Sequence, residues 1–225
     1  TGGAARVMSW LEEFLQTEWL DMQVFCTSVT EQWAVLSISG PNSRNFLSEL
    51  TDIDLSKESF PFMRFREGKV CGIDARVFRI SFTGELAFEV NIPARYGSYV
   101  WNEFMTHGKK YNITPYGTEA MHVLRAEKGF IIVGQDTDGS VTPFDLNMEW
   151  IVSKKKEDFL GKRSFSRSDT SRNDRKKLVG LLVNDKTTVL PEGSHIVEKS
   201  KSQPPMKMLG HVSSSYFSPT NGYPI

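Results

Sequence analysis

Several marks of well-known protein classes are missing from this sequence. It contains two cysteines, Cys26 and Cys71, and their spacing forms no CxxC pair. We therefore expect the reduced thiols of a cytoplasmic protein, not a disulfide framework or a zinc site. No apolar run approaches the roughly 20 residues of a membrane-spanning helix, and no signal peptide is recognisable. The sequence thus predicts no association with a membrane.

An excess of charge of either sign is also lacking. Lys and Arg together number 27, as do Asp and Glu, so the formal net charge is zero. Proteins that neutralise nucleic-acid phosphates usually carry a basic excess, so nucleic acid is not expected as a partner. The four histidines are scattered without the spacing of a metal site, and no phosphate loop or GxGxxG motif is present. We expect no metal site and no dinucleotide bound by this chain.

What the sequence does have is enough apolar side chains for one large domain or two smaller ones. Hydrophobic residues make up 39% of the 225. Residues 4–19 carry Val7, Trp10, Leu11 and Phe14 in the stripe of an amphipathic helix. We expect paired strands at 24–29 and 33–38 joined by a hairpin at 30–32, further helices at 42–50, 97–109 and 117–128, and further strands at 70–80 and 86–92. This order predicts an α+β fold.

The composition changes after residue 163. Residues 164–177 are rich in serine and in charged side chains, which predicts an exposed linker after a first domain at 1–163. Short apolar segments at 178–183, 194–197 and 209–212 alternate with turn residues, so 178–225 is predicted to be a small all-β, barrel-like domain. Because the chain begins at Thr1 and closes on a turn, we expect a fragment of a larger protein whose β domain is truncated.

The segment from Phe78 to Pro93 has the pattern of a β-hairpin with its turn at 83–85. On its second strand, apolar side chains alternate with polar ones, and Glu89 falls on the face opposite Phe88 and Val90. That polar face either meets water or lines a polar pocket.

A second candidate lies where a predicted helix ends. Arg125 occupies the last turn, Gly129 stops the helix, and a glycine-bounded loop at 134–139 follows with two aspartates. Such a helix end can bind a polar or anionic ligand. A cation there also offsets the helix dipole, which is a purely structural role.

Four stretches together resemble the folate-binding aminomethyltransferase family, which includes the T-protein of the glycine cleavage system. They are residues 1–5 with 10–12, residues 27–34 with 39–44, the hairpin and helix just described, and residues 209–216 with 218–219. They span nearly the whole chain in the family's order. Within the family they are most similar to the carboxy-terminal part of the alpha subunits of heterotetrameric sarcosine oxidases. Phe130 departs from a related, thiol-dependent family that carries a Lys-Gly-Cys motif here.

This resemblance implies a folate-binding domain followed by a compact barrel, and it assigns site residues. The family's folate glutamate falls on Glu89, whose carboxylate suits the two parallel N–H donors of a pterin edge. The arginine of the family's LRxE motif falls on Arg125, and a guanidinium suits the anionic folate tail. Thr83 and Gly84 form the predicted turn and either contact the ligand or only shape the chain. Tyr116 either stacks on a flat ligand or packs at a helix start.

The resemblance also implies a function. The chain would bind tetrahydrofolate and capture the one-carbon unit from the oxidative demethylation of sarcosine as methylenetetrahydrofolate. FAD, FMN and NAD would be held outside this chain, by other subunits or by other parts of the alpha subunit. The family's acidic residue near the reactive folate nitrogen would precede Thr1, so the catalytic residues are unknown and this piece alone is expected to be inactive. A glycine-cleavage-type aminomethyltransferase and a non-catalytic structural relative remain alternatives.

Overall fold

The computed structural model describes residues 2–201 and 203–225; Thr1, part of the first family-like stretch, lies outside the described residues. The chain forms two compact units. Unit 1 comprises residues up to 81 together with 85–115, and unit 2 comprises 82–84 together with 116–225. The predicted domain boundaries at 163 and 178 stay a prediction.

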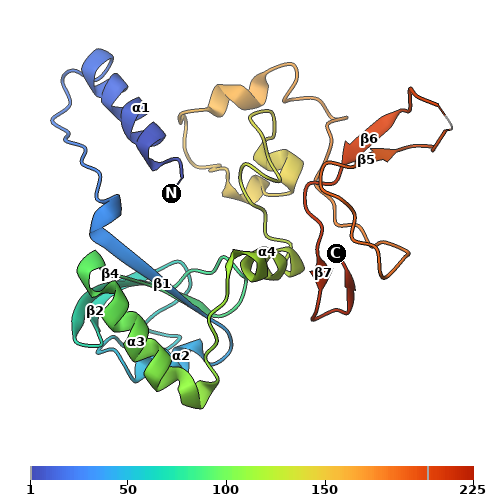
Figure 1. The fold of residues 1–225 in the computed structure, drawn as a ribbon. Helices are drawn as coiled ribbons and strands as arrows, with labels where there is room; N and C mark the ends of the chain where they lie inside the picture. The colour runs from blue at the N-terminus through green and yellow to red at the C-terminus, as the bar shows by residue number, and fades with distance from the viewer. Residues whose placement is uncertain (1, 202) are drawn as a thin grey trace. The chain divides into compact units, whose positions relative to one another are not determined.

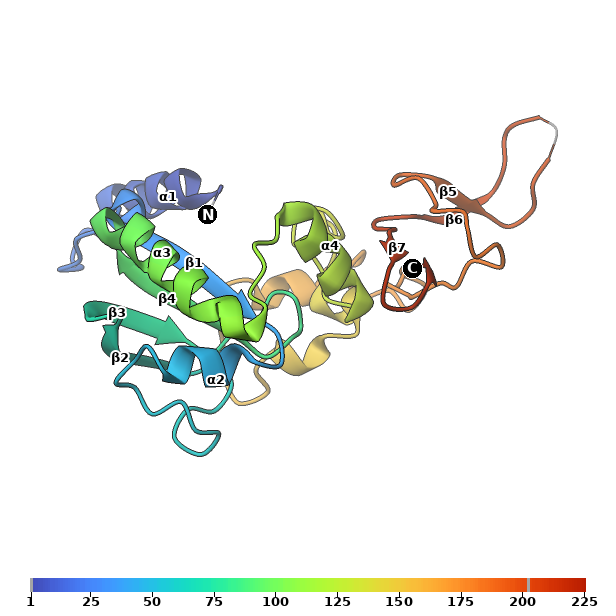
Figure 2. The same cartoon turned by 60° about the horizontal axis from the view of Figure 1, so that its bottom comes forward.

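Unit 1 is built on a four-stranded antiparallel sheet with the strand order β1-β4-β3-β2. Figure 1 labels β1, β2 and β4 of this sheet, and Figure 2 labels all four strands. Its strands are β1 (Trp33–Ser39), β2 (Phe65–Val70), β3 (Ile73–Phe78) and β4 (Ala87–Pro93). β4 pairs with β1 on one side and with β3 on the other, and is therefore internal. Its backbone is hydrogen-bonded on both edges, and successive side chains of β4 point to opposite faces of the sheet.

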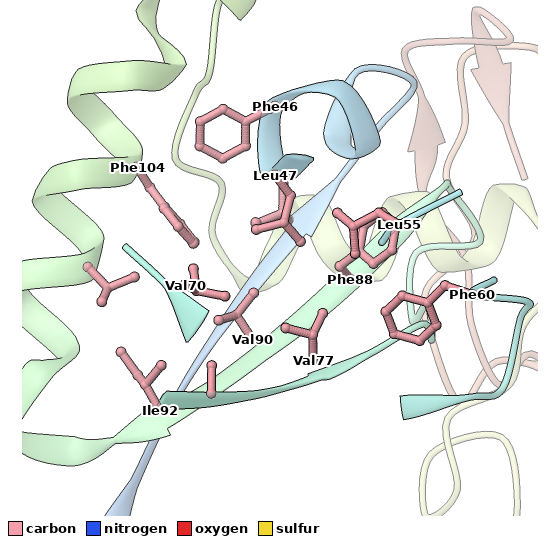
Figure 3. Close-up of a cluster of buried hydrophobic side chains, with 13 residues drawn as sticks. Phe46, Leu47, Leu55, Phe60, Val70, Val77, Phe88, Val90, Ile92 and Phe104 are labelled. Atoms are coloured by element: carbon pink, nitrogen blue, oxygen red, sulfur yellow. The ribbon is translucent and has the colours of Figure 1, made fainter. Parts of the chain in front are cut away.

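Helices cover one face of this sheet. α2 (Ser43–Ser48) and α3 (Gly97–His107) lie on the same side of it (Figure 2). Phe46 and Phe104 meet edge to face, with their ring centroids 5.4 Å apart. They join a cluster of buried apolar side chains from the strands and the adjoining loops (Figure 3). Burial of this kind stabilises a fold by roughly 1.5–3 kcal/mol per large side chain. The cluster comprises Ile38, Phe46, Leu47, Leu55, Phe60, Val70, Ala75, Val77, Phe88, Val90, Ile92, Val100 and Phe104.

The amino-terminal helix α1 (Ala4–Thr17) forms as predicted, but its apolar stripe is not covered. None of its residues is buried, and the ring of Trp10 meets that of Phe14 edge-on, with 5.2 Å between the centroids. The amphipathic pattern therefore predicts the helix but does not predict which part of the protein its apolar side chains contact.

Two strand predictions in unit 1 were wrong or imprecise. Residues 24–29 form no strand, and residues 30–32 are a short 3₁₀ helix instead of a hairpin turn. β1 pairs with β4 because that pairing buries Ile38 against the core. The predicted pairing around Glu89 is correct, since β3 and β4 are antiparallel neighbours, but the connection extends from residue 79 to 86.

Unit 2 combines the α-helix α4 with 3₁₀ helices at Pro143–Leu146, Glu149–Ile151 and Lys162–Ser166 and with short strands. α4 (Thr118–Glu127) is the predicted helix, and Gly129 follows it with a positive φ of 69°. Strands β5 (His195–Val197) and β6 (Met208–His211) form one pair, and β7 (Phe217–Ser218) and β8 (Tyr223–Pro224) form another. The helix and sheet content agrees with the predicted α+β class. Over the described residues the strands do not close into a barrel, and 178–183 is not a strand, so the barrel-like domain is not confirmed.

The segment predicted to be a linker is anchored near its end. Arg175 donates to both carboxylate oxygens of Asp145, at 2.8–3.1 Å, and to the carbonyl oxygen of Ser140 at 2.6 Å. Hydrogen bonding by Arg175, more than any other cause, lowers the pKa of Asp145 to about 2. Asp145 also caps the 3₁₀ helix Pro143–Leu146 through a reciprocal pair of contacts with Thr142. Most other side chains of 164–177 are exposed.

In the part of the chain that the structure describes, no helix has the length and apolar character needed to cross a membrane.

We expect limited trypsin digestion to cut first after Arg167, Arg172 or Lys176, which are exposed, while Arg175 is held against Asp145. Mass spectrometry of the first fragments tests this. Early cuts inside the β2–β4 region with residues 164–177 intact would contradict it and the predicted boundary.

Candidate functional site

The five residues predicted to bind the ligand are divided between the two units. Glu89 belongs to unit 1, on β4. Thr83, Gly84, Tyr116 and Arg125 belong to unit 2.

Glu89 lies on the face of the sheet that the core does not occupy. Its neighbours Phe88 and Val90 are fully buried on the opposite face, whereas the side chain of Glu89 is half-buried. Burial raises the pKa of the Glu89 carboxyl above its usual value. Among the described residues, no cation forms an ion pair with it. A carboxylate in this state favours a ligand that donates hydrogen bonds to it.

On its face of the sheet, Glu89 has one aromatic and one polar cross-strand neighbour. Its cross-strand partners are Ser37 on β1 and Phe78 on β3. The ring of Phe78 stacks on Phe65 of β2, with 5.5 Å between the centroids. Residues directly opposite one another in a sheet share one face, so an aromatic pair and a hydroxyl border the carboxylate. This face can take a flat, hydrogen-bond-donating ring.

Arg125 occupies a very different setting, a buried polar network within unit 2. Its side chain is 3% exposed, and its Nη1 donates to Asp136 Oδ2 at 2.7 Å and to the carbonyl oxygen of Phe130 at 3.0 Å. Its Nη2 donates to Ser214 Oγ at 2.6 Å and to the Tyr216 hydroxyl at 3.3 Å. Both terminal nitrogens are therefore engaged by protein groups.

Asp136 is the partner that balances this buried charge. Its Oδ1 accepts from the hydroxyls of Ser213 and Ser214, and its Oδ2 accepts from the backbone N–H of Ile132 at 2.8 Å. Desolvation alone would raise the pKa of Asp136, but these hydrogen bonds and the charge of Arg125 hold it below its usual value. Asp136 is thus ionised at neutral pH, and the pair links α4 to the segment that leads into β7.

One donor of Arg125 is left over. Nε is buried and has no hydrogen-bond partner among the described residues. The hydrogen bonds of this network therefore explain why a cation is buried here, and they leave one N–H of the guanidinium unsatisfied. A role of Arg125 in ligand binding stays a prediction.

Thr83 and Gly84 are both tightly enclosed in unit 2. Thr83 is 2% exposed, and its hydroxyl is buried without a hydrogen-bond partner among the described residues. Gly84 has a φ of +76°, and a Cβ at this position would overlap the side chain of Lys128. Gly84 therefore has a structural reason to be glycine, whereas a role of the Thr83 hydroxyl in ligand binding stays a prediction. Tyr116 precedes α4 and is 39% exposed.

The partners of Arg125 were not among the predicted site residues. Asp136 lies in the glycine-bounded loop that the sequence indicates, and Ser214 and Tyr216 lie in the last family-like stretch. The sequence signal for the Arg125–Asp136 pair was two opposite charges separated by a short apolar segment, residues 130–133. A separation of about ninety residues hides the link from Arg125 to Ser214. Over the described residues, no cluster of His, Cys, Asp and Glu could hold a metal ion.

Comparisons with known proteins agree with the sequence resemblance. Residues 1–156 match the family described as the GCVT N-terminal domain. The sarcosine oxidase subunit alpha of Corynebacterium sp. (strain U-96) is 55% identical, over 99% of this chain and 23% of that subunit. The chain therefore spans about a quarter of the subunit's length. The aminomethyltransferase of Thermoanaerobacter sp. (strain X514) is 30% identical, over 88% of this chain and 51% of that protein.

A solved structure shows the same fold. The glycine cleavage system aminomethyltransferase T from Bartonella henselae superposes with a TM-score of 0.74 at 22% identity, covering 99% of this chain and 56% of that one. The resemblance to the family, and within it to the sarcosine oxidase alpha subunits, is confirmed.

We expect Arg125→Met to destabilise unit 2 by about 3–5 kcal/mol, because it leaves the Asp136 carboxylate buried without its charge partner. Hydrogen exchange of the α4 amides measures this locally. The double variant Arg125→Met/Asp136→Leu should cost clearly less than the sum of the single changes. The control Arg172→Met breaks an exposed pair with Asp174 and should have a much smaller effect, because solvent screens exposed ion pairs. Equal effects of Arg125→Met and Arg172→Met would mean that the buried pair does not hold unit 2 together.

Proposed function

Because this chain belongs to the GCVT N-terminal domain family, we propose that it is the tetrahydrofolate-binding module of a sarcosine oxidase alpha subunit. The 55% identity to the corynebacterial subunit, over almost the whole chain, supports this branch of the family. The observation that carries the proposal is the half-buried Glu89 carboxylate, which has a raised pKa, an aromatic neighbour and no cation paired with it among the described residues.

The residues of unit 1 fit a pterin. The ring offers an amino group and an adjacent ring N–H, which are two parallel donors, and a carboxylate accepts both. Glu89 supplies that acceptor, and the stacked rings of Phe78 and Phe65 supply apolar surface beside it. Partial burial makes each such hydrogen bond stronger than it would be in water. In this arrangement Glu89 orients the ring and Phe78 excludes water from its edge.

The residues of unit 2 have separate roles in the proposal. The Thr83 hydroxyl, buried and without a partner among the described residues, offers a donor or acceptor to the ligand. Tyr116 offers an exposed aromatic face, and Gly84 keeps the chain close to Lys128. Arg125 contributes a cation whose terminal nitrogens are already engaged. We therefore propose that Arg125 acts on an anionic folate tail through its charge more than through new hydrogen bonds.

In the whole enzyme, bound tetrahydrofolate would accept the one-carbon unit that the oxidation of an N-methyl amine such as sarcosine releases. Redox chemistry would reside with FAD, FMN and NAD outside this chain, and the other sarcosine oxidase subunits would be its partners. The contribution of this chain is binding and orientation, in a cytoplasmic enzyme.

A second candidate is a glycine-cleavage-type aminomethyltransferase. The 30% identity to the Thermoanaerobacter enzyme favours it to some degree. Docking a lipoylated carrier protein would call for a basic surface, and the balanced charge of the chain does not favour one. A non-catalytic structural relative is a third candidate, and the absence of tetrahydrofolate binding in a titration would favour it.

Glu89→Gln should weaken tetrahydrofolate binding roughly tenfold or more. The change keeps the size but directs a donor at a donor, and hydrogen bonds to a charged group are worth about 1.5–3 kcal/mol. Calorimetric titration of both proteins measures the loss. Glu67→Gln is the matched control, because Glu67 is on the same sheet but exposed and paired with Arg76 at 2.9 Å. Equal affinities of Glu89→Gln and the unchanged protein would remove Glu89 from the site, and a large loss of unliganded stability would make it a structural residue.

The purified chain alone should neither oxidise sarcosine nor transfer an aminomethyl group, because the redox cofactors are proposed to lie outside it. Oxygen consumption with sarcosine and formation of methylenetetrahydrofolate are the two assays. Turnover in either assay, without a partner subunit, would overturn the assignment of catalysis to other parts of the enzyme.

A further inference from the structure

Two arginines of unit 1 converge on one buried aromatic ring. The guanidinium carbon of Arg44, on α2, lies 5.6 Å from the ring centroid of Phe88, and that of Arg79 lies 5.4 Å from the same centroid. Phe88 is fully buried and belongs to the core cluster (Figure 3). The two cations are therefore positioned by the core and are not free on the surface.

The two charges are close enough to disfavour one another. Partial burial, and then the neighbouring charge of Arg44, lower the pKa of Arg79 below its usual value. No carboxylate of the described chain forms an ion pair with either arginine. Two cations held together without an anion are unfavourable, and an added anion would relieve the repulsion.

The hydrogen-bond donors here are also unmet. Among the residues that the structure describes, the buried Nη1 of Arg44 has no hydrogen-bond partner, and neither has the buried hydroxyl of Ser81, two residues after Arg79. Buried donors of this kind are rare, because each costs the full desolvation of the group. An unsatisfied guanidinium N–H beside a second arginine, and an unsatisfied hydroxyl two residues after that arginine in the chain, are what a ligand that accepts several hydrogen bonds would satisfy.

Arg66 shows what a satisfied arginine looks like in the same unit. Its guanidinium carbon lies 5.5 Å from the ring centroid of Phe60, in a similar cation–aromatic contact. Its terminal nitrogens, however, donate to the carbonyl oxygens of Phe65 and Ser59 at 2.9 and 2.6 Å. Stacking on an aromatic ring thus does not by itself leave donors unmet. Stacking explains why Arg44 and Arg79 lie against Phe88, but not why the buried Nη1 of Arg44 has no hydrogen-bond partner among the described residues.

We propose that Arg44 and Arg79, with the hydroxyl of Ser81, form a binding site for a small oxyanion, either a carboxylate or a phosphate group. A guanidinium presents parallel N–H donors that match two oxygens of either group, and two guanidinium groups can share one anion. The site lies within unit 1 and involves neither Glu89 nor tetrahydrofolate, so it goes beyond the proposed function.

The test uses the 225-residue chain without folate. Its thermal unfolding is followed in sodium phosphate, sodium acetate and sodium chloride at equal ionic strength, and affinities are measured by calorimetry. We expect phosphate or acetate to raise the unfolding temperature more than chloride does, because a ligand that binds only the folded state stabilises it. A rise with phosphate alone identifies a phosphate site, and a rise with acetate alone identifies a carboxylate site. No difference among the three salts overturns the proposal.

Variants then locate the effect. Arg44→Gln and Arg79→Gln should each lower the affinity for the effective anion at least roughly tenfold, since each removes a charge-assisted contact. Arg66→Gln, the matched control, should leave the affinity unchanged. An equal loss in Arg66→Gln would mean a general charge effect and would overturn the site.

A second variant keeps the test decisive if Arg79→Gln unfolds. Arg44→Lys retains the positive charge and the contact with Phe88 but loses the forked donors, so the chain should fold and bind the anion more weakly. Binding as strong as in the unchanged protein would show that no forked recognition takes place at Arg44.

Discussion

The two-residue alternation of β4 is the constraint on which the arrangement of unit 1 depends. Phe88, Val90 and Ile92 all have zero exposure, and they point to the face that α2 and α3 cover. With those three side chains fixed in the core, Glu89 can only point to the other face. The same burial places the Phe88 ring where Arg44 and Arg79 reach it. A shift of β4 by one residue would expose the core side chains and bury the carboxylate.

Unit 2 is held together by a different kind of interaction. The buried apolar cluster lies in unit 1, whereas the buried side chains of unit 2 include Arg125, Thr142, Asp145, Ser215 and Ser218. Two ion pairs, Arg125–Asp136 and Arg175–Asp145, take the place that a hydrophobic core has in unit 1. Buried pairs of this kind define geometry well, because each partner left alone is strongly unfavourable. Unit 2 therefore depends on complementary charges far apart in the sequence.

The contrast explains how far the sequence could predict this molecule. Apolar residues recur at short, regular intervals in the helices α1, α3 and α4 and in the strand β4. This local pattern was enough to predict these elements and the face of the sheet on which Glu89 lies. The pairing of β1 with β4, and the partners of Arg125, depend on residues about fifty to ninety positions apart, which no local period records. Residues 24–29 and 178–183 have the apolar, β-prone composition of strands but find no partner strand. The family resemblance predicted the fold and the candidate residues, whereas the arginine pair at Phe88 appears only in three dimensions.

Gly84 illustrates how two constraints at one position make a substitution hard to compensate. A side chain there must adopt a left-handed backbone conformation, at roughly 1–2 kcal/mol for an ordinary L-residue, and must also displace Lys128. Shortening Lys128 to alanine would remove its Cγ and Cδ, but would leave its Cβ 2.8 Å from the added atom and the backbone cost in place. The effects of substitutions at residues 84 and 128 are therefore not symmetric. Loss of the lysine side chain can be tolerated with glycine retained, whereas loss of the glycine is not rescued by any change at residue 128.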